Sequence, residues 1–471
     1  MNRDLDKKST FAVFIGNRGF FPASLLSQAR DDLSRRLKAL GHEALMLDPA
    51  ATRHGAVETP AEGRLFAEFL QRHRGGFDGV ILTLPNFGDE NGAATALKDA
   101  GVPILIQAYP DQLDKMAPEL RRDAFCGKFS IMDVFCQNGM KFTNLQPHTV
   151  HPDSELFAAN IEYFDRLCRV TSSLKNLTIG AIGARTTAFK TVRIDELALQ
   201  RNGVTVETFD LSDLFSGIES LEDSDPLVEA KIRRLQDYTH WEGIPQQPLS
   251  TIAKMGVVID RMVEEYQLDA LAIRCWIEMQ EQLGISPCVL LSEMNDRGLP
   301  AACELDIGNA VIMAALSRAG GHPATCLDWN NNYGDDPDKC ILFHCGSAPQ
   351  SMMSEKGRVT DHEILKNSLG PGRSYGCNVG RIAPMPITYG SLLSENGKLE
   401  VYLGEGRFTE DPIPPDFFGC AGVVQIDNLQ DALQAIGNRG FRHHVSATRG
   451  HLLEPTREAL EKYLGYNVIR V

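Results

Sequence analysis

Residues 79–109 read GVILTLPNFGDENGAATALKDAGVPILIQAY. The apolar runs GVILTLP and PILIQAY have the length of buried strands, and the segment from Ala93 to Ala100 between them has a helical pattern. A strand, a helix and a second apolar strand in this order are typical of a parallel sheet with crossover helices. This stretch therefore predicts an α/β fold in the first part of the chain.

The same alternation continues on both sides of this stretch. Upstream lie FAVFIG, from Phe11, and ALMLD; downstream lie LTIGAIG, VTVETFDL, DALAIRCW, AACEL and ATCLDW, with helical segments between them. We therefore predict two doubly wound α/β domains, over residues 1–165 and 166–335. The length of 471 residues agrees with about three domains in all.

Residues 336–471 have a different pattern. Short β-rich runs, CILFHCG, GRIAPMPITYGSLL, LEVYLGEGRF and GCAGVVQI, are separated by glycine, proline and other turn residues. Asn396-Gly397 joins two of these runs, and this dipeptide is a strong hairpin signal. We predict a β-rich, barrel-like C-terminal domain.

Charge and hydropathy exclude several classes of function. The net charge is −15, and no cluster of lysine and arginine is present of the kind that nucleic-acid binding requires. No apolar stretch approaches the roughly 20 residues that span a bilayer. The first residues, MNRDLDKKSTFAVFIG, lack the pattern of a signal peptide. We expect a cytoplasmic protein without nucleic-acid or membrane partners.

Two carboxylates follow predicted strands of the second α/β domain. Glu304 ends AACEL, and Asp328 stands in ATCLDW. If both strands belong to one sheet, the two side chains emerge at the same edge, as in a divalent metal site or an acid–base pair. The alternative for Glu304 is a helix N-terminal acid, and for Asp328 a turn before Asn330 and Asn331.

Histidines that could complete a metal site lie in the C-terminal part. His344 ends the apolar run CILFHCG, and His443 and His444 stand together in GFRHHVSA. A single histidine is more often structural or exposed than functional. Imidazole and carboxylate ligands together suit ions such as Mn²⁺ or Co²⁺.

These segments resemble the L-fucose isomerase family and, more distantly, the L-arabinose isomerases. The resemblance lies in residues 285–316 (ISPCVLLSEMNDRGLPAACELDIGNAVIMAAL), 325–332 (TCLDWNNN), 380–406 (GRIAPMPITYGSLLSENGKLEVYLGEG) and 440–451 (GFRHHVSATRGH). It implies two α/β domains followed by a β-rich domain. It also implies a homo-oligomer, often a hexamer, in which the N-terminal domain of a neighbouring copy completes the active site.

The resemblance also implies roles for individual residues. Glu304, Asp328 and a terminal histidine would bind the metal, and the two acids would also move the proton. The interval to Gly450-His451 favours His444 over His443, and His344 resembles an additional ligand of the arabinose branch. Mn²⁺ is the ion we expect, with Co²⁺ or Mg²⁺ as alternatives.

The expected reaction is the metal-dependent interconversion of an aldose and a ketose through an enediolate. Trp276, Asn330 and Arg18 are candidate sugar contacts, and each also has an ordinary structural role open to it. The substrate is a monosaccharide, such as a deoxy or an anionic, sulfonated hexose. Two alternatives stay open, namely a non-catalytic two-lobed sugar-binding protein and a metal-dependent aldolase or hydrolase.

Overall fold

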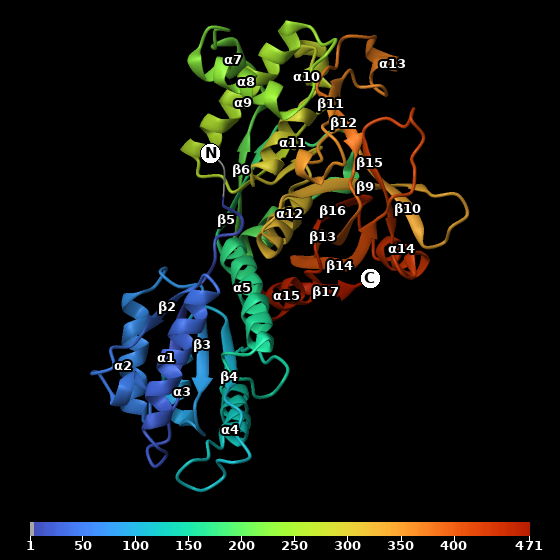
Figure 1. Cartoon of the computed structure of the whole chain (residues 1–471). Helices are drawn as coiled ribbons and strands as arrows, with labels where there is room; N and C mark the ends of the chain where they lie inside the picture. The colour runs from blue at the N-terminus through green and yellow to red at the C-terminus, as the bar shows by residue number, and fades with distance from the viewer. Residues whose placement is uncertain (1–3) are drawn as a thin grey trace. The chain divides into compact units, whose positions relative to one another are not determined.

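The computed structural model describes residues 4–471 and divides the chain into two compact units (Figure 1). One unit is Lys7–Ser172, and the other is Met1–Asp6 with Ser173–Val471. Residues 1–3, which the sequence analysis includes in the first domain, lie outside the described part.

The N-terminal unit is a parallel four-stranded sheet in the order β2-β1-β3-β4, flanked by helices (Figure 1). The strands are β1 (Thr10–Ile15), β2 (Glu43–Met46), β3 (Gly79–Leu84) and β4 (Ile104–Ala108). The helices are α1 (Ser24–Ala39), α2 (Pro60–Arg72), α3 (Glu90–Leu97), α4 (Ala124–Gln137) and α5 (Glu155–Lys175). All six residues of β3 are buried, which explains its continuous apolar run.

The second unit begins with another parallel sheet, in the order β6-β5-β7-β8. Its strands are β5 (Leu177–Ile182), β6 (Val204–Phe209), β7 (Ala270–Ile273) and β8 (Ala301–Cys303). Its helices are α6 (Glu196–Arg201), α7 (Leu211–Glu219), α8 (Pro226–Tyr238), α9 (Gln246–Glu265), α10 (Glu278–Leu283), α11 (Cys288–Asp296) and α12 (Ile307–Gly320). Helix α12 is buried along almost its whole length, in keeping with its apolar sequence.

The remaining strands form a nine-stranded sheet that closes on itself. They are β9 (Ala324–Asn332), β10 (Lys339–His344), β11 (Arg358–Thr360), β12 (Cys377–Arg381), β13 (Met385–Glu395), β14 (Lys398–Phe408), β15 (Cys420–Gln425), β16 (His444–Arg449) and β17 (Asn467–Arg470). The ring runs β15-β10-β9-β16-β13-β14, and pairing of β14 with β15 closes it. Helices α13 (Lys366–Leu369), α14 (Leu429–Asn438) and α15 (Leu453–Glu458) accompany it.

The predicted fold class is confirmed, and so is the hairpin at Asn396-Gly397, which joins β13 to β14. One expectation within it is wrong. ATCLDW is not a strand of the second parallel sheet, because β9 pairs antiparallel with β10 and β16 in the barrel. The domain boundaries at residues 165 and 335 stay predictions. Within residues 4–471, no helix has the length and apolar character needed to cross a membrane.

Candidate functional site

Three neighbouring barrel strands bring Asp328, His344 and His444 together. Strand β9 lies between β10 and β16 in the sheet, where Asp328 pairs with Phe343, the residue before His344, on one side and with His444 on the other. The register makes His444 the direct partner of Asp328 across β16 and β9. Directly opposite residues on antiparallel strands have Cβ atoms about 5 Å apart, which is close enough for their side chains to share a ligand.

Glu304 reaches the same place from the short turn between β8 and α12. Glu304 and Leu305 both have left-handed backbone, with φ of 58° and 59°. This conformation is uncommon for residues other than glycine and costs about 1–3 kcal/mol for each residue. The turn is held because the amide of Leu305 donates to the carbonyl of Ile273 at 3.1 Å. Strained backbone of this kind is often found at functional sites.

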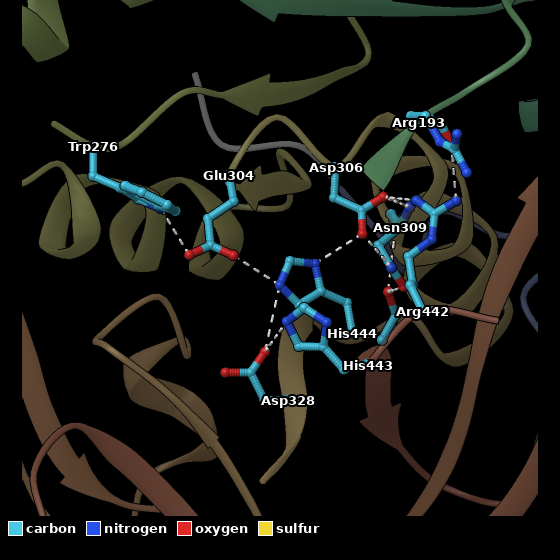
Figure 2. A network of polar contacts seen from close by, with 10 residues as sticks. Arg193, Trp276, Glu304, Asp306, Asn309, Asp328, Arg442, His443 and His444 are labelled. Atoms are coloured by element: carbon cyan, nitrogen blue, oxygen red, sulfur yellow. Dashed lines mark hydrogen bonds and ion pairs between the residues drawn. The ribbon is translucent and has the colours of Figure 1, made fainter. Parts of the chain in front are cut away.

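The side chains form two overlapping groups of metal-ligand type. Ligand atoms of Glu304, His344 and His444 lie within 4.8 Å of one another, and so do those of Asp328, His443 and His444. Nε2 of His444 is 2.9 Å from Oε2 of Glu304 and 3.4 Å from Oδ1 of Asp328. Figure 2 shows both carboxylates directed at this imidazole.

Two buried atoms of the site lack a hydrogen-bond partner, namely Nε2 of His344 and Oδ1 of Asp328. A buried polar atom without a partner costs free energy, and a bound cation would remove that cost. Carboxylate oxygens and imidazole nitrogens are ligands that first-row divalent ions accept. The residues present therefore fit a divalent metal ion.

Charge is strongly coupled within the site. Burial alone would raise the pKa of Glu304, but the hydrogen bond with His444 and the charges of His344 and His444 lower it to about 2. Burial likewise opposes the charge of His444, yet Cys326, Asp306 and Glu304 beside it hold the pKa of the imidazole well above its ordinary value. Glu304 therefore stays ionised at neutral pH, as a metal ligand or a general base must.

Trp276, which follows β7, contacts Glu304 directly. Its indole Nε1 donates to Oε1 of Glu304 at 3.0 Å. The ring of Phe189, on the loop that follows β5, lies 5.8 Å from the ring of Trp276 and 5.4 Å from that of His443. The carboxylate of Glu304 is thus held by Trp276 on one oxygen and by His444 on the other (Figure 2).

The two adjacent histidines differ sharply in environment. The side chain of His444 is fully buried, whereas that of His443 is 42% exposed. Nε2 of His443 lies 3.7 Å from Oδ1 of Asp328. Burial and the neighbouring His444 lower the pKa of His443.

Sequence reasoning missed Asp306, which contacts His444 on its other nitrogen. Oδ2 of Asp306 is 2.8 Å from Nδ1 of His444, and Asp306 also caps the N-terminus of α12. An aspartate directly before an apolar helix is a recognisable N-cap signal. The contact with His444, 138 residues later, has no local sequence signal.

Asn330 is the remaining candidate in this unit, and two arginines, Arg185 and Arg274, follow strands of its parallel sheet. Asn330, interpreted as a sugar contact or a turn residue, is an exposed residue of β9. Arg274 follows β7, forms an ion pair with Glu278 and donates to the carbonyl of Ala184 at 3.3 Å. Arg185 lies on the loop after β5 and is half-buried. In the order β6-β5-β7-β8, β5 and β7 flank the topological switch point, where open α/β sheets bind ligands.

Arg18 belongs to the N-terminal unit and follows β1. Its Nε donates to the carbonyl of Gly88 at 2.9 Å, its guanidinium pairs with Glu90, and it lies 4.2 Å from the ring centre of Phe87. In the order β2-β1-β3-β4, β1 and β3 flank the switch point of this sheet. Arg18 is therefore placed at the ligand-binding edge of its own sheet.

Two family models match the chain. One, described as the N-terminal domain of fucose/sulfoquinovose isomerase, matches residues 12–175. The other, described as the C-terminal domain of L-fucose isomerase, matches residues 342–471. Together they cover more than half of the 471 residues.

Curated relatives carry a related name. The chain is 23% identical to a sulfoquinovose isomerase from Priestia aryabhattai, over 64% of this chain and 67% of the relative. It is 22% identical to a sulfoquinovose isomerase from Alkalicoccus urumqiensis, over 83% of this chain and 85% of the relative. A solute-binding protein from Agrobacterium vitis with bound alpha-D-tagatopyranose is 10% identical over 67% of this chain and 90% of that chain; its TM-score of 0.17 supports no conclusion.

Proposed function

This chain belongs to the fucose isomerase family of aldose–ketose isomerases, and we propose that it isomerises a monosaccharide with the help of a divalent metal ion. The observation that carries the proposal is that ligand atoms of Glu304, His344 and His444 lie within 4.8 Å of one another and that Asp328 approaches the same imidazole of His444. These are the residues that the sequence segments similar to fucose isomerases imply as ligands.

In this proposal, Glu304, Asp328 and His444 hold the metal, and His344 supplies a further ligand. Mn²⁺ is the ion we favour, with Co²⁺ or Mg²⁺ as alternatives, because the ligand set mixes carboxylates with imidazoles. When bound, the ion would act as a Lewis acid that stabilises the negative charge of the enediolate.

The residues of the chain would move the proton between C1 and C2 of the sugar. Glu304 and Asp328 approach His444 from different elements, β8–α12 and β9, so that a sugar bound at this point meets a carboxylate on two sides. One carboxylate would take the proton from one carbon, and that proton, or one from the other acid in its protonated form, would be delivered to the neighbouring carbon, while the hydroxyl proton would pass from one oxygen to the other. Trp276 would keep Glu304 oriented during this transfer.

The substrate that we favour is a sulfonated hexose. The curated relatives are named sulfoquinovose isomerases, and arginines lie at the ligand-binding edges of both parallel sheets. These are Arg18 in the first sheet and Arg185 and Arg274 in the second. Arginine suits such a role because its planar guanidinium donates two parallel hydrogen bonds to an oxyanion. A neutral deoxy sugar such as a fucose is the alternative substrate.

We also propose that the protein is a cytoplasmic homo-oligomer. Arg18 would then come from the N-terminal domain of one copy and contact the sugar bound by another. A hexamer is the arrangement that the resemblance implies.

Aldose-to-ketose conversion should be measured on a panel of neutral and sulfonated sugars, before and after EDTA treatment and after addition of Mn²⁺. We expect one sulfonated hexose to be converted, with activity lost to EDTA and restored by Mn²⁺. Full activity after complete metal removal would overturn the metal dependence but not the isomerase function.

The same assay separates the two alternative functions. Sugar binding without turnover in the Mn²⁺-loaded protein would favour a binding protein. Carbon–carbon cleavage products, or hydrolysis products, would favour an aldolase or a hydrolase. Retention of all carbons in a ketose product is the result that the proposed function requires.

A further inference from the structure

The imidazole of His444 is held at both nitrogens inside the protein. Nδ1 lies 2.8 Å from Oδ2 of Asp306, and Nε2 faces Glu304 and Asp328. The side chains of His444 and Asp306 are both fully buried. The orientation of Nε2 toward the two carboxylates therefore depends on the contact between Asp306 and Nδ1.

Asp306 is itself surrounded by donors. Oδ1 accepts from the backbone amide of Asn309 at 3.0 Å and pairs with Nη1 of Arg442. Oδ2 accepts from Nδ2 of Asn309 at 2.7 Å in addition to its contact with His444. The Arg442 side chain is 1% exposed, so its charge is directed at Asp306 rather than at solvent (Figure 2).

The absence of a side chain at Gly308 leaves room for the guanidinium of Arg442 beside Asp306. A Cβ atom at this position would lie 2.8 Å from Nη1 of Arg442 and 3.1 Å from the carbonyl oxygen of Leu392. Because a real Cβ is essentially never found that close, any larger residue at position 308 would displace the guanidinium. The packing around Arg442 is therefore specific to its contact with Asp306.

We propose that Asp306 is a positioning residue of the metal site, which keeps the proton of His444 on Nδ1 and so leaves Nε2 as the ligand atom. The inference rests on the proposed metal function. Histidines that bind metals usually donate their other ring N–H to a carboxylate or carbonyl, and loss of that partner weakens metal affinity about 10- to 100-fold. Here the partner is fixed by a buried arginine and an asparagine.

Asp306→Asn tests this role while keeping size and helix capping, because asparagine and aspartate are equally good N-caps. An asparagine side chain has one acceptor oxygen, whereas an aspartate has two, and that oxygen is needed beside the positive charge of Arg442. The NH₂ group of the asparagine therefore faces Nδ1 of His444. Nδ1 must then accept a hydrogen bond, so that the proton of the imidazole moves to Nε2. We expect the Kd for Mn²⁺ to rise about 10- to 100-fold.

The matched control is Asp225→Asn. Asp225 also caps a helix, α8, where it accepts from the amide of Leu227 at 2.8 Å, and it also has an arginine partner, Arg261 at 3.9 Å. This variant should bind Mn²⁺ as the unmodified protein does. Affinity is measured by titration calorimetry of the metal-free proteins, and visible absorption of the Co²⁺-loaded proteins reports whether a ligand has changed.

The outcomes separate the two proposals. If the unmodified protein binds no Mn²⁺, Co²⁺ or Mg²⁺, the metal function and this inference both fail. If it binds Mn²⁺ and a folded Asp306→Asn variant binds equally well with the same Co²⁺ spectrum, only the inference fails. If Asp306→Asn has no cooperative thermal transition, Asp306→Glu is tested in its place. Glutamate keeps the negative charge beside Arg442 but displaces the carboxylate. An unchanged Mn²⁺ affinity of Asp306→Glu would then overturn the positioning role of Asp306.

Discussion

Asp328 on β9 and His444 on β16 are directly opposite residues of two antiparallel strands, and their side chains approach to 3.4 Å. The adjacent His443 precedes β16 and has a partly exposed side chain. Both imidazoles lie near Asp328, but the register places the buried His444 directly opposite it, whereas His443 lies just outside the strand.

This relationship predicts different effects of the two histidine substitutions. His444→Gln removes the nitrogen that faces Glu304 and Asp328, and we expect kcat/KM to fall on the order of a thousandfold, the equivalent of the several kcal/mol that metal stabilisation supplies. His443→Gln changes a partly exposed side chain, and we expect at most about a tenfold fall, about 1.4 kcal/mol.

Both variants should be assayed at saturating Mn²⁺ and their bound metal measured after dialysis. Loss of metal from His444→Gln alone is the expected pattern. Equal losses in both variants would mean that the histidines act together, and the reverse order would assign the ligand to His443.

The α/β part and the hairpin were predictable because their signals are local. Buried parallel strands are continuous apolar runs, and Asn396-Gly397 defines a tight turn. Asp328, a predicted site residue, lies beside His444 in the structure, but its strand was assigned to the wrong sheet. ATCLDW has the same apolar character as a parallel strand, and pairing with β10 and β16 depends on segments up to the far end of the chain.

The hydrogen bond from Trp276 to Glu304 predicts a second, smaller effect on catalysis. Trp276→Phe keeps the aromatic ring but removes the indole N–H that donates to Glu304. A hydrogen bond to a charged group is worth about 1.5–3 kcal/mol, so we expect kcat/KM to fall roughly 10- to 100-fold. Trp241→Phe is the matched control, because its indole also donates one hydrogen bond, to the carbonyl of Leu235. Equal activity of the two variants would contradict a role of Trp276 in orienting Glu304.

The lowered pKa of Glu304 predicts how the metal-free protein responds to acid. With a pKa of about 2 in the folded chain, against 4.5 for an unperturbed glutamate, folding favours the ionised form. This contribution to the free energy of unfolding is fully present above pH 4.5 and is lost as the pH falls toward 2.

Urea unfolding of the metal-free protein and of Glu304→Gln between pH 7 and pH 3 measures this contribution. The unmodified protein should lose stability more steeply below pH 4.5 than the variant. Parallel curves over the whole range would show that Glu304 does not carry the expected linkage.

Asp306 shows why part of the site was not predictable. Its N-cap position is visible in the sequence, yet its function follows from contacts with Arg442 and His444 more than 130 residues later. Such contacts depend on how β16 is placed beside α12, which no local pattern encodes. Sequence patterns indicate residue types that bind a metal, whereas the side chains that orient those residues are found only once the fold is known.

The proposed contact of Arg18 with the sugar of a neighbouring copy predicts that residues of two copies of the chain form one active site. Arg18→Ala should raise KM for a sulfonated sugar about tenfold or more, since a charged hydrogen bond is worth about 1.5–3 kcal/mol. The matched control is Arg53→Ala, because Arg53 also bonds a glycine carbonyl, that of Gly19, and pairs with a glutamate, Glu58.

Co-expression of Arg18→Ala with His444→Gln tests whether two copies share one site. Mixed oligomers contain sites with an intact Arg18 from one copy and an intact His444 from another. Activity at low substrate well above the sum of the two separate variants is the expected result, and activity equal to that sum would show that Arg18 does not contribute to a neighbour's site.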